Sequence, residues 1–366
     1  RISRKRGKAR EDTNPRQRLT VTHDAFEIGG FSIPPNSRQT VDLPVSVLSD
    51  HTPVNMSVHV VHGREPGPTL FVSAAIHGDE VMGVEVVRRL LRVPSIDTMK
   101  GTMLAVPIVN SYGFLSHSRY LPDRRDLNRS FPGDAVGSLA ARLAHKFMTE
   151  IVARSDVGID LHSAAIHRTN LPQVRVSPSK PETFALAEVF GAPIVMTSGL
   201  RDGSLRQAAQ QHDVDVLLFE AGEALRFDEV AVRTGVVGIL RVMRHLGMVK
   251  AKGIAKPKVA PMRSSSSFWL RAPVGGLLRT LKKIGTQVEG GEVLGLVSDP
   301  FGDFESEVIA DEPGLLVGRT NLPVVNEGDG LFHIARIRPH DDPAVTIDRL
   351  AGQLEGDPLF DEDEII

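Results

Sequence analysis

His77 and Glu80 lie three residues apart in the segment Thr69-Leu-Phe-Val-Ser-Ala-Ala-Ile-His-Gly-Asp-Glu80. The apolar run at 70–76 has the length and β-branched content of a buried strand, and helical periodicity begins just after Gly78. The two side chains therefore lie at a strand-to-helix corner, where an imidazole and a carboxylate can converge on one point. Two histidines and one glutamate are a ligand set that catalytic zinc takes from proteins, so this pair supplies two of three ligands. The chain has no cysteine, and any metal must be held by His, Asp or Glu.

Two further apolar runs end in residues that could complete such a site. His162 ends the short strand predicted at 157–161, which would lie in the same sheet as the strand before His77. It is the best candidate for the third ligand, although a lone histidine after an apolar strand is usually structural. Glu220 ends the run Leu217-Leu-Phe, and a carboxylate there is costly to bury unless it is used. Glu220 is therefore a candidate general base for activating a metal-bound water.

The loop at 110–134 contains a second group of polar residues, among them Arg119, Asn128 and Arg129. Its proline and glycine content is typical of an ordered loop rather than a core element. The guanidinium groups could bind a carboxylate or a developing oxyanion, and Asn128 could add an amide donor. The alternative is a salt-bridged surface loop, which is what most arginine-rich loops are.

Strands and helices alternate through the part of the chain that positions these residues. We expect strands at 70–76, 102–109, 157–161, 193–197 and 215–219, and helices at 80–92, 138–153, 181–190, 203–212 and 228–246. Short alternating runs between residues 19 and 61 predict antiparallel strands before them. This order predicts an α/β sandwich with a largely parallel or mixed sheet, whose functional loops lie at the carboxyl ends of the strands.

The motifs HGDE, DLNRSFPG, DLHS and FEAGE, in this order, resemble the succinylglutamate desuccinylase/aspartoacylase family of the zinc carboxypeptidase superfamily, over roughly residues 66–247. The resemblance implies a three-layer α/β/α sandwich with a mixed sheet. It implies that one Zn²⁺ per chain is bound by His77, Glu80 and His162, and that Glu220 transfers protons. It also implies that Arg119 polarises the scissile carbonyl, while Asn128 and Arg129 bind a substrate carboxylate.

The activity that this resemblance implies is zinc-dependent hydrolysis of the amide bond of an N-acyl amino acid, or of a similar small carboxylate-bearing amide. Two alternatives stay open: a zinc carboxypeptidase acting on a peptide C-terminus, and a non-catalytic zinc-binding scaffold. The net charge is −2, and neither a membrane-spanning run nor a secretory leader is visible. We therefore expect a cytoplasmic protein with no nucleic-acid or membrane partner.

The composition changes beyond the deacylase domain expected at 21–250. A linker rich in Lys, Pro and Ser is predicted at 251–267, followed by a small all-β, barrel-sandwich-like domain at 268–340. That domain contains a degenerate repeat, in which Gly276-Leu-Leu precedes Val288 and Gly314-Leu-Leu precedes Val325. It resembles biotinyl/lipoyl modules, but residues 299–310 contain no lysine, so we expect no covalent cofactor. The domain could support a homo-oligomer, and we expect a basic tail at 1–20 and an acidic tail at 341–366.

Overall fold

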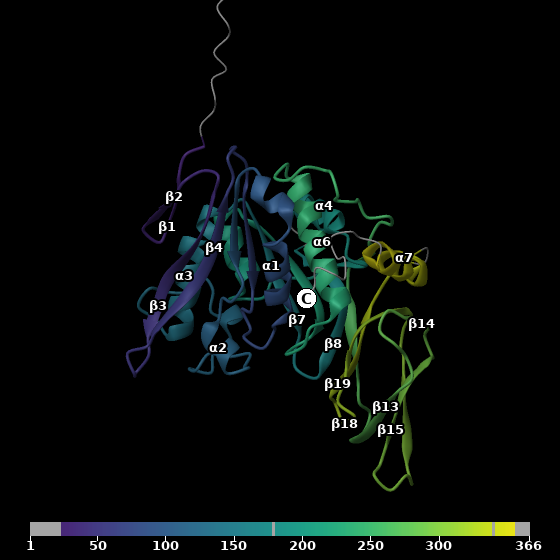
Figure 1. The fold of residues 1–366 in the computed structure, drawn as a ribbon. Helices are drawn as coiled ribbons and strands as arrows, with labels where there is room; N and C mark the ends of the chain where they lie inside the picture. The colour runs from purple at the N-terminus through teal and green to yellow at the C-terminus, as the bar shows by residue number, and fades with distance from the viewer. Residues whose placement is uncertain (1–22, 178–179, 339–340, 356–366) are drawn as a thin grey trace, which may run out of the picture.

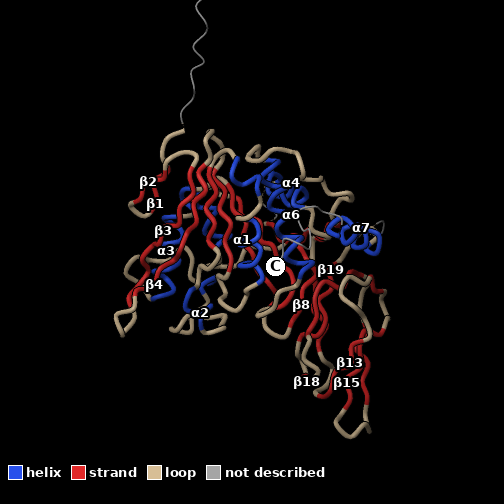
Figure 2. The backbone as a smooth tube through the Cα atoms, in the orientation of Figure 1, coloured by secondary structure: helices blue, strands red, loops and turns tan. Residues whose placement is uncertain are grey.

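The computed structural model describes residues 23–177, 180–338 and 341–355. The predicted basic tail at 1–20 and the acidic cluster at 357–364 lie outside these described residues. Within them, the chain forms a large mixed sheet, a smaller antiparallel sheet of four strands, and a hairpin of β1 (Phe26–Ile28) and β2 (Phe31–Ile33). Figures 1 and 2 show the large sheet in the main body and the smaller sheet projecting from it.

Parallel strands form the centre of the large sheet, in the order β10-β7-β5-β6. Their bounds are β5 (Thr69–Ala74), β6 (Thr102–Val106), β7 (Val157–Ala164) and β10 (Asp215–Glu223). Antiparallel strands flank them: β4 (Pro53–His62) and β3 (Ser37–Val47) beyond β6, and β8 (Arg168–Val176) beyond β10. β9 (Ile194–Thr197) pairs in parallel with β8, and β11 (Met262–Ser264) with β9. The mixed sheet predicted from the sequence is confirmed.

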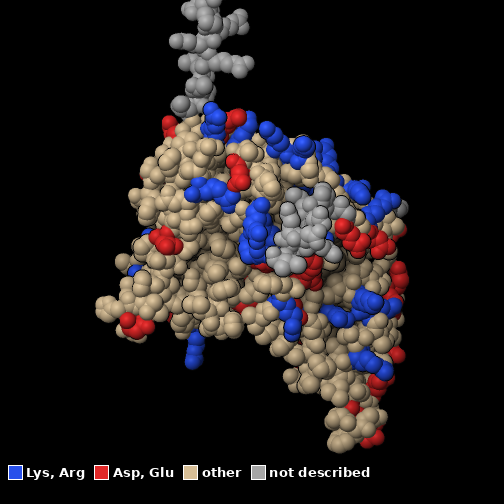
Figure 3. Space-filling model, in the orientation of Figure 1, with Lys and Arg blue, Asp and Glu red and all other residues tan. Residues whose placement is uncertain are grey.

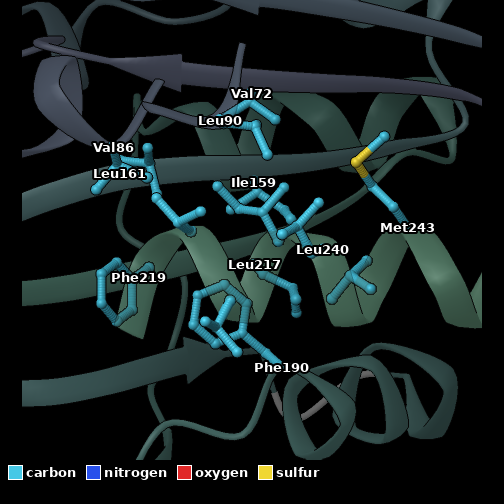
Figure 4. Close-up of a cluster of buried hydrophobic side chains, with 14 of the residues drawn as sticks. Val72, Val86, Leu90, Ile159, Leu161, Phe190, Leu217, Phe219, Leu240 and Met243 are labelled. Atoms are coloured by element: carbon cyan, nitrogen blue, oxygen red, sulfur yellow. The ribbon is translucent and has the colours of Figure 1, made fainter. Parts of the chain in front are cut away.

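Helices cover both faces of this sheet. On one face lie α1 (Met82–Leu90), α4 (Pro181–Phe190) and α6 (Glu229–His245), which pack on alternate residues of the central strands. Figure 4 shows this core, in which Leu217 and Phe219 of β10 contact the layer that contains Phe190 and Leu240. On the other face lie α3 (Leu139–Glu150) and α5 (Leu205–Ala209). The arrangement is the predicted three-layer α/β/α sandwich.

Short helical turns occupy the connections. They are α2 (Ser111–Leu115) and the 3₁₀ turns η1 (Pro94–Thr98), η2 (Leu127–Arg129), η3 (Val152–Arg154) and η4 (Gln210–His212). None of the helices in the described ranges is both long and apolar enough to cross a membrane. Basic and acidic side chains are both spread over the face shown in Figure 3.

The C-terminal strands are divided between two facing sheets. β12 (Ser267–Arg271), β14 (Gln287–Val288), β17 (Gly314–Thr320) and β19 (Gly330–Ala335) extend the large sheet, because β17 pairs with β8. β13 (Gly276–Thr280), β15 (Val293–Ser298), β16 (Glu305–Ile309) and β18 (Val324–Val325) form the smaller one. The two sheets share an apolar core that includes Leu270, Val297 and Phe332. Residues 267–335, all of them described, therefore make a two-sheet sandwich and not a closed barrel.

The degenerate repeat corresponds to an exchange of strands between its two halves. β14, from the first half, pairs with β17, and β18, from the second half, pairs with β13. Each Gly-Leu-Leu segment thus starts a strand whose partner is the valine segment of the other half. This is the internal pseudo-symmetry that the sequence predicts.

Several elements were not predicted. β8 is one, and β11 is a strand within the segment expected to be a linker, at 251–267. α7 (Pro343–Glu355) lies in the segment expected to be an acidic tail. That expectation is wrong for these residues, because Leu350 and Leu354, one helical turn apart, pack against the core beneath α6.

Candidate metal centre and active site

The corner after β5 brings His77 and Glu80 together. The backbone of Gly78 lies so close to α2 that a Cβ on residue 78 would be 1.9 Å from the carbonyl carbon of Gly113. The amide of Glu80 donates to the carbonyl of His77 at 3.1 Å, which closes the turn before α1 begins at Met82. The result is a tight corner that directs both side chains into the protein, where each is less than 5 % exposed.

His162 meets this pair from β7, the strand beside β5. Its Nδ1 lies 2.7 Å from Oε2 of Glu80, and Nδ1 of His77 lies 2.7 Å from Oε1 of the same carboxylate. One ligand atom from each of the three residues can be chosen so that all lie within 4.8 Å of one another. Nitrogen, nitrogen and oxygen donors that converge in this way fit a zinc ion. All three predicted ligands are therefore in one place.

The second nitrogen of each histidine faces a carboxylate. Nε2 of His162 is 2.8 Å from Oδ2 of Asp160, which shares its face of β7 because side chains two residues apart point the same way. Asp160 is itself held by a hydrogen bond of 2.8 Å from Oγ of Ser73. Nε2 of His77 is 3.1 Å from Oδ1 of Asp126. Such carboxylates fix the orientation of a metal-binding histidine and raise its basicity.

The charges of His77, Glu80 and His162, which we call the trio, favour a cation between the three side chains. Burial raises the pKa of Glu80, but His77 and His162 outweigh burial and hold that pKa well below its usual range. Burial lowers the pKa of His162, but Asp160 and Glu80 outweigh it and raise that pKa well above the usual value. The carboxylate is thus ionised and attracts positive charge, and a metal ion that binds there displaces protons.

Glu220 lies beside the trio on β10, in register with His162 of β7. Its Oε2 accepts a hydrogen bond of 2.8 Å from Nδ2 of Asn170 and is 3.2 Å from a guanidinium nitrogen of Arg175. Both partners come from β8, the strand that the sequence analysis missed. A carboxylate held on one oxygen and 15 % exposed is suited to exchanging a proton with a ligand in the site.

The arginine-rich loop folds over the same site. Arg119 donates to Oε1 of Glu80 at 3.2 Å and to Oδ2 of Asp126 at 3.1 Å, so its guanidinium lies next to the trio. Oδ1 of Asn128 accepts from the amide of Leu205 at 2.9 Å, which leaves its NH₂ group for other partners. Burial lowers the pKa of Arg129, which also donates to the carbonyl of Asn128. Arg119 is thus part of this site and also salt-bridged, to Glu80 and Asp126, while Arg129 is exposed.

A cavity of about 540 Å³ opens between these elements, and all seven predicted site residues line it. Further lining residues were not singled out by the sequence analysis: Asn170 and Arg175 of β8, Arg206 of α5, Trp269 of β12 and His333 of β19. Asn170 and Arg175 have no local signal in the sequence, because the strand that carries them was itself not predicted. Trp269 and His333 have none, because only the pairing of β17 with β8 brings their strands to the cavity.

A buried two-histidine, one-glutamate centre beside a carboxylate, at the edge of a mixed sheet in an α/β/α sandwich, defines a site of the metallohydrolase type. Comparison with known proteins narrows the class. Residues 66–246 match the model of the succinylglutamate desuccinylase/aspartoacylase catalytic domain. The chain belongs, through this domain, to the succinylglutamate desuccinylase/aspartoacylase family.

Among characterised proteins, the chain is similar to the N-alpha-acetyl-L-2,4-diaminobutyric acid deacetylase of Halomonas elongata. The two are 27 % identical over 286 residues, which cover 75 % of this chain and 84 % of the relative. Among solved structures, a succinylglutamate desuccinylase/aspartoacylase from Rhodobacter sphaeroides has a TM-score of 0.73 at 24 % identity, covering 82 % of this chain and 96 % of that one. The product-bound ectoine utilization protein EutE (DoeB) from Ruegeria pomeroyi has a TM-score of 0.74 at 22 % identity, covering 87 % and 98 %. The structures support the fold.

Proposed function

We propose that the protein is a zinc-dependent hydrolase that cleaves the amide bond of a small N-acyl amino acid. The observation that carries this proposal is the convergence of His77, Glu80 and His162 beside the carboxylate of Glu220, in a cavity lined by guanidinium groups. When bound by the trio, zinc supplies an activated water at neutral pH and a Lewis acid for the scissile carbonyl. The family and the deacetylase relative support the same reaction class.

The residues around the trio have separate tasks in this proposal. Glu220 accepts the proton of the attacking water and returns it to the leaving nitrogen, which avoids the release of an amine anion. Arg119, next to the trio, stabilises the negative charge that develops on the carbonyl oxygen. Asn128, through its free NH₂ group, and Arg129 bind the carboxylate of the amino acid.

Zinc analysis combined with an amide-hydrolysis assay tests the proposal. We expect one zinc per chain and hydrolysis of N-acyl amino acids by the wild type, and neither in His77→Ala. Glu220→Gln should keep its zinc and lose about 10²- to 10⁴-fold in rate. His245→Ala, which alters an exposed histidine at the end of α6, is the control and should match the wild type. Full activity in both His77→Ala and Glu220→Gln would refute the proposal.

A zinc carboxypeptidase is the second candidate, because Asn128 and Arg129 would suit the carboxylate of a peptide as well. β12 and β19 form part of the cavity wall through Trp269 and His333, which favours a small substrate. Comparing N-acyl amino acids with dipeptides decides between the two. The scaffold alternative is not favoured, because Asn170 and Arg175 hold Glu220 at the cavity wall. The cytoplasmic location and self-association stay predictions.

A further inference from the structure

The strand that carries Glu220 is irregular directly after that residue. Between Glu220 and Glu223, β10 advances by three residues while its neighbour β7 advances by two. Between Glu220 and Gly222, β10 advances by two residues while β8, on its other side, advances by three. Gly222 has a φ of 70°, in the left-handed region that glycine adopts freely. Bulges of this kind redirect side chains beside active sites, so the direction of the Glu220 carboxylate depends on how residues 221–223 are held.

Glu223 ties this irregular end of β10 to neighbouring elements. Its Oε1 accepts a hydrogen bond of 3.0 Å from the backbone amide of His167, in the turn between β7 and β8. Its Oε2 accepts one of 3.1 Å from Nδ2 of Asn321, in the connection between β17 and β18. The side chain is 14 % exposed, and Nε of Arg226 lies 3.4 Å from Oε2. Both carboxylate oxygens of Glu223 are therefore in use.

Asn321 belongs to the C-terminal sandwich, and it contacts the start of β8 as well as Glu223. Its backbone amide donates to the carbonyl of His167 at 2.7 Å, and its Nδ2 also donates to Oγ1 of Thr169 at 2.5 Å. His167 has a φ of 63°, a conformation that is costly for a residue other than glycine and persists only where its surroundings hold it. Glu223, His167 and Asn321, which we call the junction, thus connect β10, β8 and β17.

A second contact from β17 supports the residue that holds Glu220. Gly318 of β17 pairs with Asn170 of β8. A Cβ at Gly318 would lie 2.8 Å from Oδ1 of Asn170, so the backbone of β17 lies directly against this side-chain amide. The same amide donates from Nδ2 to Oε2 of Glu220 at 2.8 Å. The C-terminal sandwich therefore supports the surroundings of Glu220 at two points, Gly318 and Asn321.

We infer that Glu223 and Asn321 are positioning residues for the general base, and that the C-terminal sandwich contributes to catalysis through them. This inference rests on the proposed function, in which Glu220 exchanges the proton. Both residues lie outside the cavity lining, so they act on Glu220 through the bulge of β10 and not on a substrate. A base that is displaced by about an ångström transfers protons poorly, while a substrate bound elsewhere in the cavity is still held. Weakening the junction should therefore lower kcat and leave KM unchanged.

Steady-state kinetics of the zinc-loaded full chain test the inference, with the N-acetyl amino acid that the wild type hydrolyses fastest as the substrate. Asn321→Ala and Glu223→Ala should each lower kcat by about tenfold, with KM and zinc content within about twofold of the wild type. Because both residues act at one junction, the double variant should lose about as much as the worse single variant. Asn326→Ala, at another exposed asparagine of the same sandwich, is the matched control and should behave as the wild type. An unchanged kcat in either single variant, or losses that multiply in the double variant, would overturn the inference.

Two comparisons distinguish positioning from a merely structural role. In the Glu220→Gln background there is no base to position, so adding Asn321→Ala should change the residual kcat by less than about twofold, whereas a general loss of structure would lower it about tenfold again. Asn321→Asp keeps the shape of the side chain but places a second carboxylate against Glu223, so it should lower kcat at least as much as Asn321→Ala. Adding Glu223→Gln to Asn321→Asp restores a donor and an acceptor in exchanged positions, and kcat should recover to within about threefold of the wild type. No recovery in this pair, or a further tenfold loss in the Glu220→Gln background, contradicts the inference.

Hydrogen–deuterium exchange separates this inference from the proposed function, since it needs no turnover. Asn321→Ala should speed amide exchange in peptides that cover residues 165–170 and 218–225, and Asn326→Ala should not. Faster exchange there, in a protein that hydrolyses no amide, would retain the junction as the element that fixes Glu220 and reject the hydrolase. Amide hydrolysis with unchanged kcat and unchanged exchange in Asn321→Ala would retain the hydrolase and reject the positioning role.

Discussion

Asp160 offers a graded test of how the metal centre is held. The residue is 1 % exposed, and its Oδ2 lies 2.8 Å from Nε2 of His162. Asp160→Asn keeps the shape and can still accept the hydrogen bond from Nε2, so only the charge is lost. Asp160→Ala removes the acceptor as well and leaves the buried N–H of His162 unpaired. We expect zinc affinity to fall in two steps, with the Asn variant between the wild type and the Ala variant.

The size of each step follows from the hydrogen bond. A bond to an ionised partner contributes about 1.5–3 kcal/mol, and a neutral one about 0.5–1.5 kcal/mol. Losing the charge in Asp160→Asn should therefore reduce the free energy of zinc binding by about 1–1.5 kcal/mol, which raises the dissociation constant for zinc about tenfold. Losing the acceptor adds the cost of a buried, unpaired donor and brings the total to about 100-fold.

Competition with a zinc chelator at fixed pH measures these constants, and circular dichroism checks that each variant is folded. Asp213→Asn is the matched control, because its side chain is 90 % exposed and pairs only with Lys180 at the surface. Its zinc affinity should equal that of the wild type. The reasoning is refuted if Asp160→Ala binds zinc within about twofold of the wild type, or if the Asn variant is the weaker of the two.

Three further predictions concern Glu220 as the general base, the corner at Gly78, and Glu85 of α1. Glu220→Gln should lower kcat by about 10²- to 10⁴-fold at unchanged zinc content, measured in parallel by steady-state kinetics and metal analysis; unchanged kcat would remove Glu220 as the base. Gly78→Ala should lower both the melting temperature and zinc affinity, because its Cβ would collide with the backbone of Gly113; a variant as stable as the wild type would contradict the tight corner. Glu85→Gln should lower the free energy of unfolding by about 1 kcal/mol at pH 7, since the carboxylate loses its ion pairs with Arg89 and with Arg88, of which Arg88 is half exposed and screened by solvent. Hydrogen bonds from Arg88 lower the pKa of Glu85, so the stabilisation by this carboxylate is present above its unfolded pKa of about 4.3 and is lost as pH falls through its folded pKa. In denaturant unfolding, the wild type and Glu85→Gln should therefore differ in stability at pH 7 and converge at pH 3. A stability difference that is the same at both pH values would contradict this prediction.

The central strands of the large sheet were predictable because they are apolar runs that are followed by, or end in, residues able to bind a metal or transfer a proton. β5, β7 and β10 are buried on both faces, so their sequences are nearly continuous apolar runs, and His77, His162 and Glu220 follow or end those runs. Parallel neighbours bring such ends to one edge of a sheet, which is why the three residues meet in the structure.

β8 escaped prediction for the opposite reason. It is mostly buried, yet it carries polar residues such as Asn170, Gln173 and Arg175, and its Pro172 interrupts the alternation. Asn170 and Arg175 line the cavity and hold Glu220, and Gln173 accepts a hydrogen bond from Arg175. These are tertiary requirements that no local pattern expresses. The same applies to Trp269, which reaches the cavity only because β17 pairs with β8 across a chain separation of about 150 residues.

Whether the C-terminal strands close into a barrel was the least predictable of their features. The repeat indicates paired halves of short strands, and both halves are present. Whether they close depends on the edges, and β17 uses one edge to pair with β8 instead. The sequence of the repeat alone contains no information about that partner.

Anomalous diffraction at the zinc absorption edge, from crystals of the zinc-loaded protein, tests the central claim most directly. We predict a single strong peak per chain, bonded to Nδ1 of His77, Nδ1 of His162 and a carboxylate oxygen of Glu80 at about 2.0–2.2 Å. The open side of the peak should face Glu220. A peak held by other side chains, or no peak in protein that still hydrolyses amides, would contradict the account.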